Sequence, residues 1–300
     1  MKKGLFIALS LCIVASLLIF IQGTDIRKAT ILISKIGYRF YLLLLITFIA
    51  YLLGTLSWKY TLGKASDKIS LSQLFFIRHI GETAAWLNPT SVIGGDAIKG
   101  LLLAKYKVDK KIVVSSLLLS RMIMIVSQIG LLLATSCYLL IQLPESSISQ
   151  FSLTRMGGLS ILSIRQNAVL KLKEVFGDLR MMLNTHRKLL IISCGFATLH
   201  WIVGSLEFFF ILKFMGLKVS IMHALLVDLG VIIFKAAGAF IPGQLGIEEY
   251  GNKIMLMAIG VPGTEIWISA SILRRARQLV WAGFGILIYF TMFYKDRLAR

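Results

Sequence analysis

Three long stretches without a single charge constrain this chain more than any other feature. They cover residues 4–22, 40–58 and 122–144. Each is about as long as the roughly 20 residues that cross the apolar core of a bilayer. Backbone N–H and C=O groups find no water there, so a lipid-facing segment has to satisfy them internally as a helix. We therefore expect an all-α polytopic membrane protein, in agreement with a mean hydropathy of +0.81.

The charge composition is also that of a membrane protein. The 33 basic and 14 acidic residues give a net charge of +19, which in this setting indicates a positive-inside bias and contact with anionic lipid. No RNA-binding aromatic motif or zinc-finger spacing is present, so we expect no nucleic-acid partner. The cysteines have no C-x-x-C spacing and the histidines form no H-x-x-x-H pair, so we expect neither a metal site nor a cofactor.

A pattern of proline, glycine, acid and arginine occurs twice, 153 residues apart. The first copy consists of Pro89, Gly94, Gly95, Asp96 and Arg121. The second consists of Pro242, Gly243, Gly246, Glu248, Glu249 and Arg274. Such a duplication predicts a single membrane domain, residues 1–300, built from two repeats at about 1–145 and 150–296.

The distribution of lysine and arginine predicts how the repeats cross the membrane. Lys2 and Lys3 place the N-terminus in the cytoplasm. We expect about six spans, at residues 4–22, 40–62, 111–142, 150–167, 189–215 and 265–294, the fourth being reduced. Two helix pairs too short or too polar to cross, at 70–88 with 95–107 and 223–241 with 247–260, predict two re-entrant hairpins. This makes about eight apolar segments.

The two repeats then have opposite orientations, with one hairpin entering from each side. Residues 168–186 predict an amphipathic helix on the inner surface. Both termini are expected in the cytoplasm, and the membrane is expected to be the bacterial inner membrane.

Arginines are predicted at the middle of the membrane in both repeats. Arg121 lies ten residues beyond Lys111, or about 15 Å at 1.5 Å per residue. Arg274 reaches a similar depth from the opposite side, next to Arg275. An arginine at that depth costs roughly 2.5 kcal/mol or more. It could bind an anion such as phosphate, whose oxygens suit the guanidinium fork, or it could pair internally with an acid for architecture alone.

A count of charges favours the anion. In and near the hairpins, four acids face eight bases: Glu82, Asp96, Glu248 and Glu249 against Arg78, Lys99, Arg121, Lys235, Lys253, Arg274, Arg275 and Arg277. We name seven candidate substrate-binding residues: Asp96, Lys99, Arg121, Glu248, Glu249, Arg274 and Arg275. Glu82 and Lys235 align between the repeats and are expected to form a gating or structural ion pair. The prolines and glycines of the pattern are expected to break helices, and the helix N-termini that follow could hold anionic oxygens.

The segments PTSVIGGDAIKGLLLAKY, FIPGQLGIEEYGNKIMLMAIGVPG and ILRRARQLVWAGFGIL resemble the lysylphosphatidylglycerol synthase transmembrane-region family, also described as a flippase-like domain. In its best-known members this region moves aminoacylated phosphatidylglycerol between leaflets, while a separate soluble domain makes that lipid. The chain ends at Arg300, so we expect a stand-alone member without aminoacyl transfer. Stand-alone members are linked to several other lipids, which leaves the cargo open.

Three functions are compatible with these features. The first is a lipid flippase or scramblase for an anionic lipid, either a phospholipid or a polyprenyl-phosphate-linked one, and not an enzyme. The second is a membrane-embedded transferase with Asp96 or Glu249 as base, although no nucleophile or nucleotide motif accompanies these acids. The third is a non-transporting partner of a lipid- or glycan-modifying enzyme.

The predicted topology can be tested by cysteine labelling in a cysteine-free background. Cysteines introduced at Ser147 and Gly263 should react with a membrane-impermeant reagent added outside the cell, because both positions are expected outside. A cysteine introduced at Asn184 should react only after the membrane is permeabilised. External labelling at Asn184 would contradict the inverted arrangement.

Overall fold

The computed structural model describes residues 26–87, 91–141, 187–237, 244–261 and 263–298. Within these ranges every regular element is a helix and none is a strand, which confirms the expected all-α class. The predicted spans at 4–22 and 150–167, the predicted amphipathic helix at 168–186 and three residues of the repeated pattern (Pro89, Pro242 and Gly243) lie outside the described residues.

Two sets of four helices follow one another in the same order. The first set is α3 (Arg39–Leu62), α4 (Leu71–Leu87), α5 (Ser91–Ala104) and α6 (Lys110–Ile141). The second set is α9 (Arg187–Phe214), α10 (Ile221–Ala237), α11 (Ile247–Ala258) and α12 (Thr264–Leu298). In both sets, two long helices enclose a pair of shorter ones. The helix α2 (Ile26–Ile36), which our sequence analysis missed, precedes α3. A 3-10 turn (Gly63–Lys68) follows α3.

Among the described residues, three helices are long and apolar enough to cross a membrane, and they coincide with predicted spans. They cover Arg39–Lys68, Lys110–Ile141 and Arg187–Phe214, where spans were expected at 40–62, 111–142 and 189–215. The fourth long helix, α12, forms as expected near 265–294 and has 35 residues. It is not among the three, and Arg274, Arg275 and Arg277 lie in its N-terminal half.

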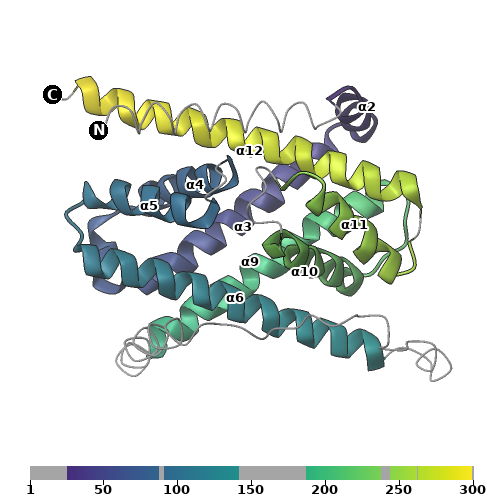
Figure 1. Cartoon of the computed structure of the whole chain (residues 1–300), viewed down its shortest axis with the longest axis horizontal. Helices are drawn as coiled ribbons and strands as arrows, with labels where there is room; N and C mark the ends of the chain where they lie inside the picture. Colours follow the sequence, from purple (N-terminus) through teal and green to yellow (C-terminus); the bar gives the residue numbers. More distant parts are fainter. Residues whose placement is uncertain (1–25, 88–90, 142–186, 238–243, 262, 299–300) are drawn as a thin grey trace.

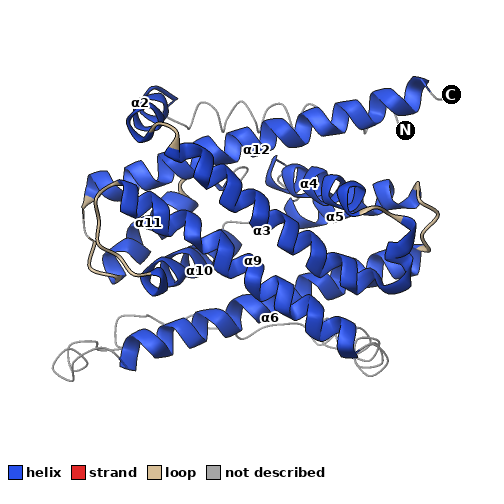
Figure 2. Cartoon of the chain, turned by 180° about the vertical axis from the view of Figure 1, so that it is seen from behind, coloured by secondary structure: helices blue, strands red, loops and turns tan. Residues whose placement is uncertain are grey.

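The helices are arranged around a central pair. The long helices α3 and α9 pack side by side across the middle of the molecule. The α4–α5 pair lies on one side of them and the α10–α11 pair on the other, while α12 and α6 run along opposite edges in opposite directions (Figure 1). The view from behind shows the same order, with α2 against one end of α12 (Figure 2).

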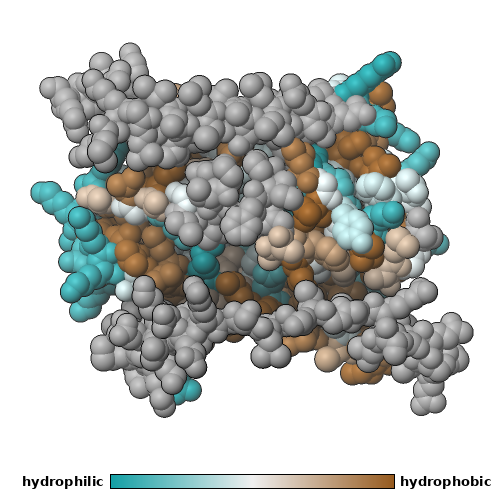
Figure 3. Space-filling model, viewed as in Figure 1, coloured by the Kyte–Doolittle hydropathy of each residue, from teal (hydrophilic) through white to brown (hydrophobic). Residues whose placement is uncertain are grey.

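Much of the outer surface is apolar. Large hydrophobic side chains are exposed along α6, among them Val126 and Leu133, and on α12, where Leu287 and Phe290 are exposed. Apolar residues occupy much of the uncovered middle of the face in Figure 3, whereas hydrophilic residues gather mainly toward its left and right ends. Exposed apolar surface of this extent is typical of a protein in contact with lipid.

Glycine allows α4 and α5 to pack closely. A Cβ added to Gly95 would lie 2.6 Å from the Cβ of Ala85 and would also collide with the carbonyl oxygen of Gly81. The prediction that Gly94 and Gly95 form the helix break was wrong: α5 begins at Ser91, so both glycines lie inside the helix, and Gly95 serves packing instead. Gly246 is the N-cap residue of α11 with a φ of 79°, as expected for a break.

Substitution of Gly95 should therefore harm folding. We expect Gly95→Val to lower the free energy of unfolding by about 1–3 kcal/mol, since overpacking forces the two helices apart. Gly130→Val on α6 is the matched control, because nothing lies within 4 Å of a Cβ at that position. Unfolding of both purified variants would be followed by tryptophan fluorescence in detergent. Equal stability of the two variants would contradict this account of the α4–α5 contact.

Candidate functional site

A cavity of about 480 Å³ lies among α3, α4, α5, α6, α9, α10 and α12, which come from both sets of helices. Its charged lining residues are Arg78, Glu82, Asp96, Lys99, Arg121, Glu207, Asp228, Lys235, Arg274 and Arg277. Aromatic and imidazole rings complete the wall, from Tyr51, Trp58, His79, Trp86, His200, Trp201 and Trp281. Ionisable residues gathered inside an otherwise apolar helical membrane protein indicate a functional site, and the volume is within the range of small-molecule sites.

In the first set of helices, ion pairs link α4, α5 and α6. The ammonium of Lys99 lies 2.6 Å from Glu82 and 3.2 Å from Asp96. Arg121 donates from Nη2 at 2.6 Å and from Nε at 3.2 Å to the same oxygen of Asp96. Lys99 is almost completely buried, while about a third of the Arg121 side chain is exposed. Three of the predicted substrate-binding residues therefore meet at one wall of the cavity.

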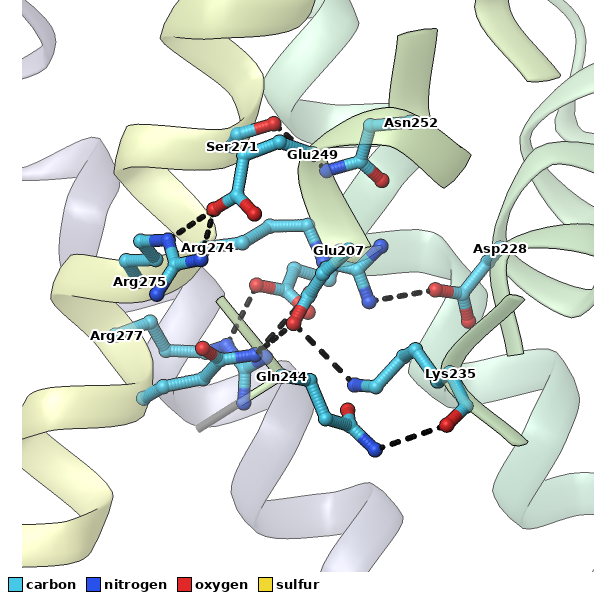
Figure 4. A network of polar contacts seen from close by, with 12 residues as sticks. Glu207, Asp228, Lys235, Gln244, Glu249, Asn252, Ser271, Arg274, Arg275 and Arg277 are labelled. Carbon is cyan, nitrogen blue, oxygen red and sulfur yellow. Dashed lines mark hydrogen bonds and ion pairs between the residues drawn. The ribbon is translucent and has the colours of Figure 1, made fainter. Parts of the chain in front are cut away.

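In the second set, Arg274 connects α12 to α10 and α11 (Figure 4). Its Nη2 lies 2.7 Å from Asp228, and its Nε lies 3.5 Å from Glu248. Its guanidinium also sits over the ring of Phe208, with 5.0 Å between Cζ and the ring centre. Lys235 approaches the other oxygen of Glu248 at 3.4 Å. Arg274, Asp228 and Glu248 are all buried, so this network lies within the protein interior.

The remaining predicted pair lies away from the cavity lining. Glu249 accepts hydrogen bonds from Arg275 and, at 2.8 Å, from the backbone N–H of Gly246. The carboxylate thus caps the first turn of α11 and connects it to α12, as Figure 4 shows for the Arg275 contact. Neither side chain is among the residues that line the cavity. The contact between Glu249 and Arg275 therefore holds α11 against α12.

Our sequence analysis missed two buried acids. Glu207 on α9 accepts a hydrogen bond from Arg277 at 2.5 Å, and Asp228 on α10 pairs with Arg274. At the offset of 153 residues these acids align with Gly54 and Phe75, so a sequence comparison at this offset could not reveal them. The available signal was the presence of a single acid inside each apolar segment.

The expected ion pair between Glu82 and Lys235 does not form, and this prediction was wrong. Both residues line the cavity, but each has a closer partner in its own helical hairpin: Lys99 lies 2.6 Å from Glu82, and Glu248 lies 3.4 Å from Lys235.

The two missed acids change the charge balance. Lys253 is exposed on α11, does not line the cavity and forms no ion pair with the described residues, so it is left out of the count, which covers the lining residues and the ion pairs beside them. Six acids now face seven bases: Glu82, Asp96, Glu207, Asp228, Glu248 and Glu249 against Arg78, Lys99, Arg121, Lys235, Arg274, Arg275 and Arg277. Internal pairing therefore accounts for most of the positive charge that the sequence left unexplained. The excess of bases over acids is reduced from four to one.

Fold and site together define a helical integral membrane protein with a charged cavity inside an apolar bundle. The chain belongs to the lysylphosphatidylglycerol synthase TM region family, whose model matches residues 7–285, and this confirms the resemblance noted in the sequence. Neither the curated proteins nor the solved structures include a match to the chain. The name of the family refers to a membrane lipid, lysylphosphatidylglycerol.

The buried pair between Arg277 and Glu207 allows a stability test. Removal of one partner leaves a buried charge uncompensated, so Arg277→Leu or Glu207→Leu alone should cost about 3–5 kcal/mol of unfolding free energy. The double variant should recover most of that loss, because two apolar side chains can replace a buried pair at little cost. Denaturant titration in detergent measures all three. A double variant as unstable as the sum of the single variants would contradict a direct interaction.

Proposed function

We propose that this protein moves an anionic lipid, a phospholipid or a polyprenyl-phosphate-linked lipid, between the leaflets of the membrane. The observation that carries the proposal is the charged cavity, whose lining comes from both sets of helices. A polar headgroup cannot cross an apolar core without desolvation. A cavity lined by guanidinium, ammonium, carboxylate and indole groups would replace its water contacts, while the acyl chains remain in the bilayer.

The position of the cavity suits a lipid. Helix α6 contributes Arg121, Gln128 and Ile125 to the lining, and the same helix exposes a largely apolar surface. A headgroup held beside α6 would leave its acyl chains next to a surface that is compatible with lipid. A soluble anion has no acyl chains that could contact that apolar surface.

The arrangement of the helices supports alternating access. We infer that α3–α6 and α9–α12 are inverted repeats, because they share one order of long and short helices and because α6 and α12 run in opposite directions. The pairs α4–α5 and α10–α11 would be re-entrant hairpins that enter from opposite sides. Inverted repeats of this kind place the substrate at their interface, and here the cavity lies between them. In this arrangement both termini are cytoplasmic, in a bacterial inner membrane.

A transferase function has weaker support. Asp96 is held by Arg121 and Lys99, and Glu249 is held by Arg275 and the start of α11. Both carboxylates are therefore engaged in structural contacts, and only Asp96 lines the cavity. A non-transporting partner of a lipid- or glycan-modifying enzyme is the other alternative, and it predicts no lipid movement by the purified protein.

Reconstitution tests the proposal directly. Purified protein would be placed in liposomes that contain fluorescent phosphatidylglycerol in both leaflets, and a membrane-impermeant reductant would bleach the outer leaflet. We expect bleaching to proceed well beyond the outer half of the fluorescence, since lipid from the inner leaflet becomes accessible. Liposomes without protein are the control. Bleaching that stops at the outer leaflet would contradict transport, and a new lipid product would support the transferase instead.

A further inference from the structure

We propose that Arg78 on α4 holds the phosphate of the lipid, and that the cavity accepts a headgroup with one net negative charge. This inference rests on the function proposed above and names the part of the lipid that the site recognises. Arg78 was counted among the bases in the sequence, but it has no counterpart in the repeated pattern, since Val231 occupies the equivalent position.

Arg78 is the base of this region that forms no ion pair in the described structure. The other six bases each lie within ion-pair distance of a carboxylate: Lys99, Arg121, Lys235, Arg274, Arg275 and Arg277. In the described parts of the chain, Arg78 has no such partner. Its Nη1 donates one hydrogen bond, to the backbone carbonyl of Tyr51 at 3.2 Å. A carbonyl oxygen satisfies one donor and neutralises no charge, so four of the five guanidinium N–H donors remain for a ligand.

The protein makes room for this guanidinium. Gly54 on α3 faces it, and a Cβ added there would lie 2.7 Å from Nη2 and 2.9 Å from Cζ of Arg78. Any side chain at residue 54 would therefore displace the guanidinium from its place in the cavity wall. The close approach explains why glycine stands inside an otherwise bulky transmembrane helix.

The charge count indicates what the ligand carries. Six acids and seven bases leave one positive charge in this region, and a charge inside an apolar bundle is costly without a counter-ion. A phosphodiester has one negative charge and would balance it. A phosphomonoester in its dianionic form would leave one negative charge in excess. A zwitterionic headgroup would bring its own cationic group close to the arginines. Arginine also matches phosphate oxygens better than lysine does, because it offers a planar fork of donors.

Other unpartnered groups in the wall are mostly donors as well. Buried N–H groups of lining residues that have no hydrogen-bond partner in the described structure include Trp58 Nε1, Trp281 Nε1 and Arg274 Nη1. On the acceptor side, Gln278 Oε1 is the matching lining atom. A cavity rich in donors favours a ligand rich in acceptor oxygens. Phosphate and glycerol oxygens of a lipid headgroup have that character.

Binding to the purified full-length chain tests the inference. Short-chain phosphatidylglycerol, phosphatidylcholine, dianionic phosphatidic acid and soluble glycerol 3-phosphate would be titrated separately in detergent, with tryptophan fluorescence as the readout. We expect phosphatidylglycerol to bind most tightly. Arg78→Gln should weaken its binding by about ten- to a hundredfold, the effect of losing a charge-assisted contact. Arg78→Lys should weaken it less. Lys253→Gln, which removes an exposed charge on α11, should leave it unchanged.

A pair of glycine variants tests the same residue without altering any charge. Gly54→Ala should weaken phosphatidylglycerol binding, because the new methyl group displaces the Arg78 guanidinium. Gly204→Ala is the matched control: Gly204 also lines the cavity, on α9, but a Cβ there meets its nearest atom, the Cβ of Ala50, at 4.0 Å. Both changes introduce alanine into a helix, so a general effect on helix stability would be shared. Thermal unfolding without lipid would confirm that each variant is folded.

The outcomes separate this inference from the transport proposal. If Arg78→Gln or Gly54→Ala binds phosphatidylglycerol as tightly as the parent protein does, Arg78 does not hold the phosphate. If glycerol 3-phosphate binds as tightly as phosphatidylglycerol, the ligand is not a lipid. If phosphatidic acid or phosphatidylcholine binds as tightly as phosphatidylglycerol, the requirement for a single negative charge is refuted. Binding that depends on Arg78 without lipid movement in liposomes would support the site and refute transport. Unchanged transport by Arg78→Gln would refute the site and leave transport standing.

Discussion

The low polarity around the central helices requires that buried charges be compensated, and the arrangement of the helices depends on this requirement. Arg274 joins α12 to α10 and α11 through Asp228 and Glu248, and Arg277 joins α12 to α9 through Glu207. Buried pairs of this kind add little net stability, because desolvation offsets most of the attraction. Their effect is on specificity, since any other packing of α12 would leave several charges without partners. We regard this as a hypothesis that the Arg277 and Glu207 variants address.

The same requirement makes an exception informative. Compensation is nearly complete around the cavity, so the single base without a carboxylate, Arg78, stands out within the described structure. Natural sequences rarely retain an uncompensated guanidinium in an apolar bundle without a function. Gly54 supports this interpretation, because the absence of a side chain at residue 54 leaves space for the Arg78 guanidinium. A ligand that supplies the missing negative charge gives both residues one physical explanation.

Parts of the site could be predicted because they depend on local sequence. Charge-free stretches identified α3 and α6, and the duplicated pattern identified Asp96, Arg121 and Arg274 as residues that meet acids or bases. Other parts depend on contacts between distant segments. The 153-residue offset aligned Glu82 with Lys235, but the nearest partner of each lies in its own hairpin. Glu207 and Asp228 have no acid at the position 153 residues earlier, so the comparison at this offset did not reveal them.

The sequence by itself determined the helical class, the position of most helices and the presence of arginines within apolar segments, because hydropathy and the backbone's need for hydrogen bonds act over short distances. Tertiary structure alone decided which charges neutralise each other. It placed Glu207 against Arg277, used Gly95 for the close packing of α5 on α4, and left Arg78 beside Gly54 with no carboxylate of the described residues within ion-pair distance. Coulombic pairing depends on distance in space, and residues that are 70 positions apart along the chain can form a close pair.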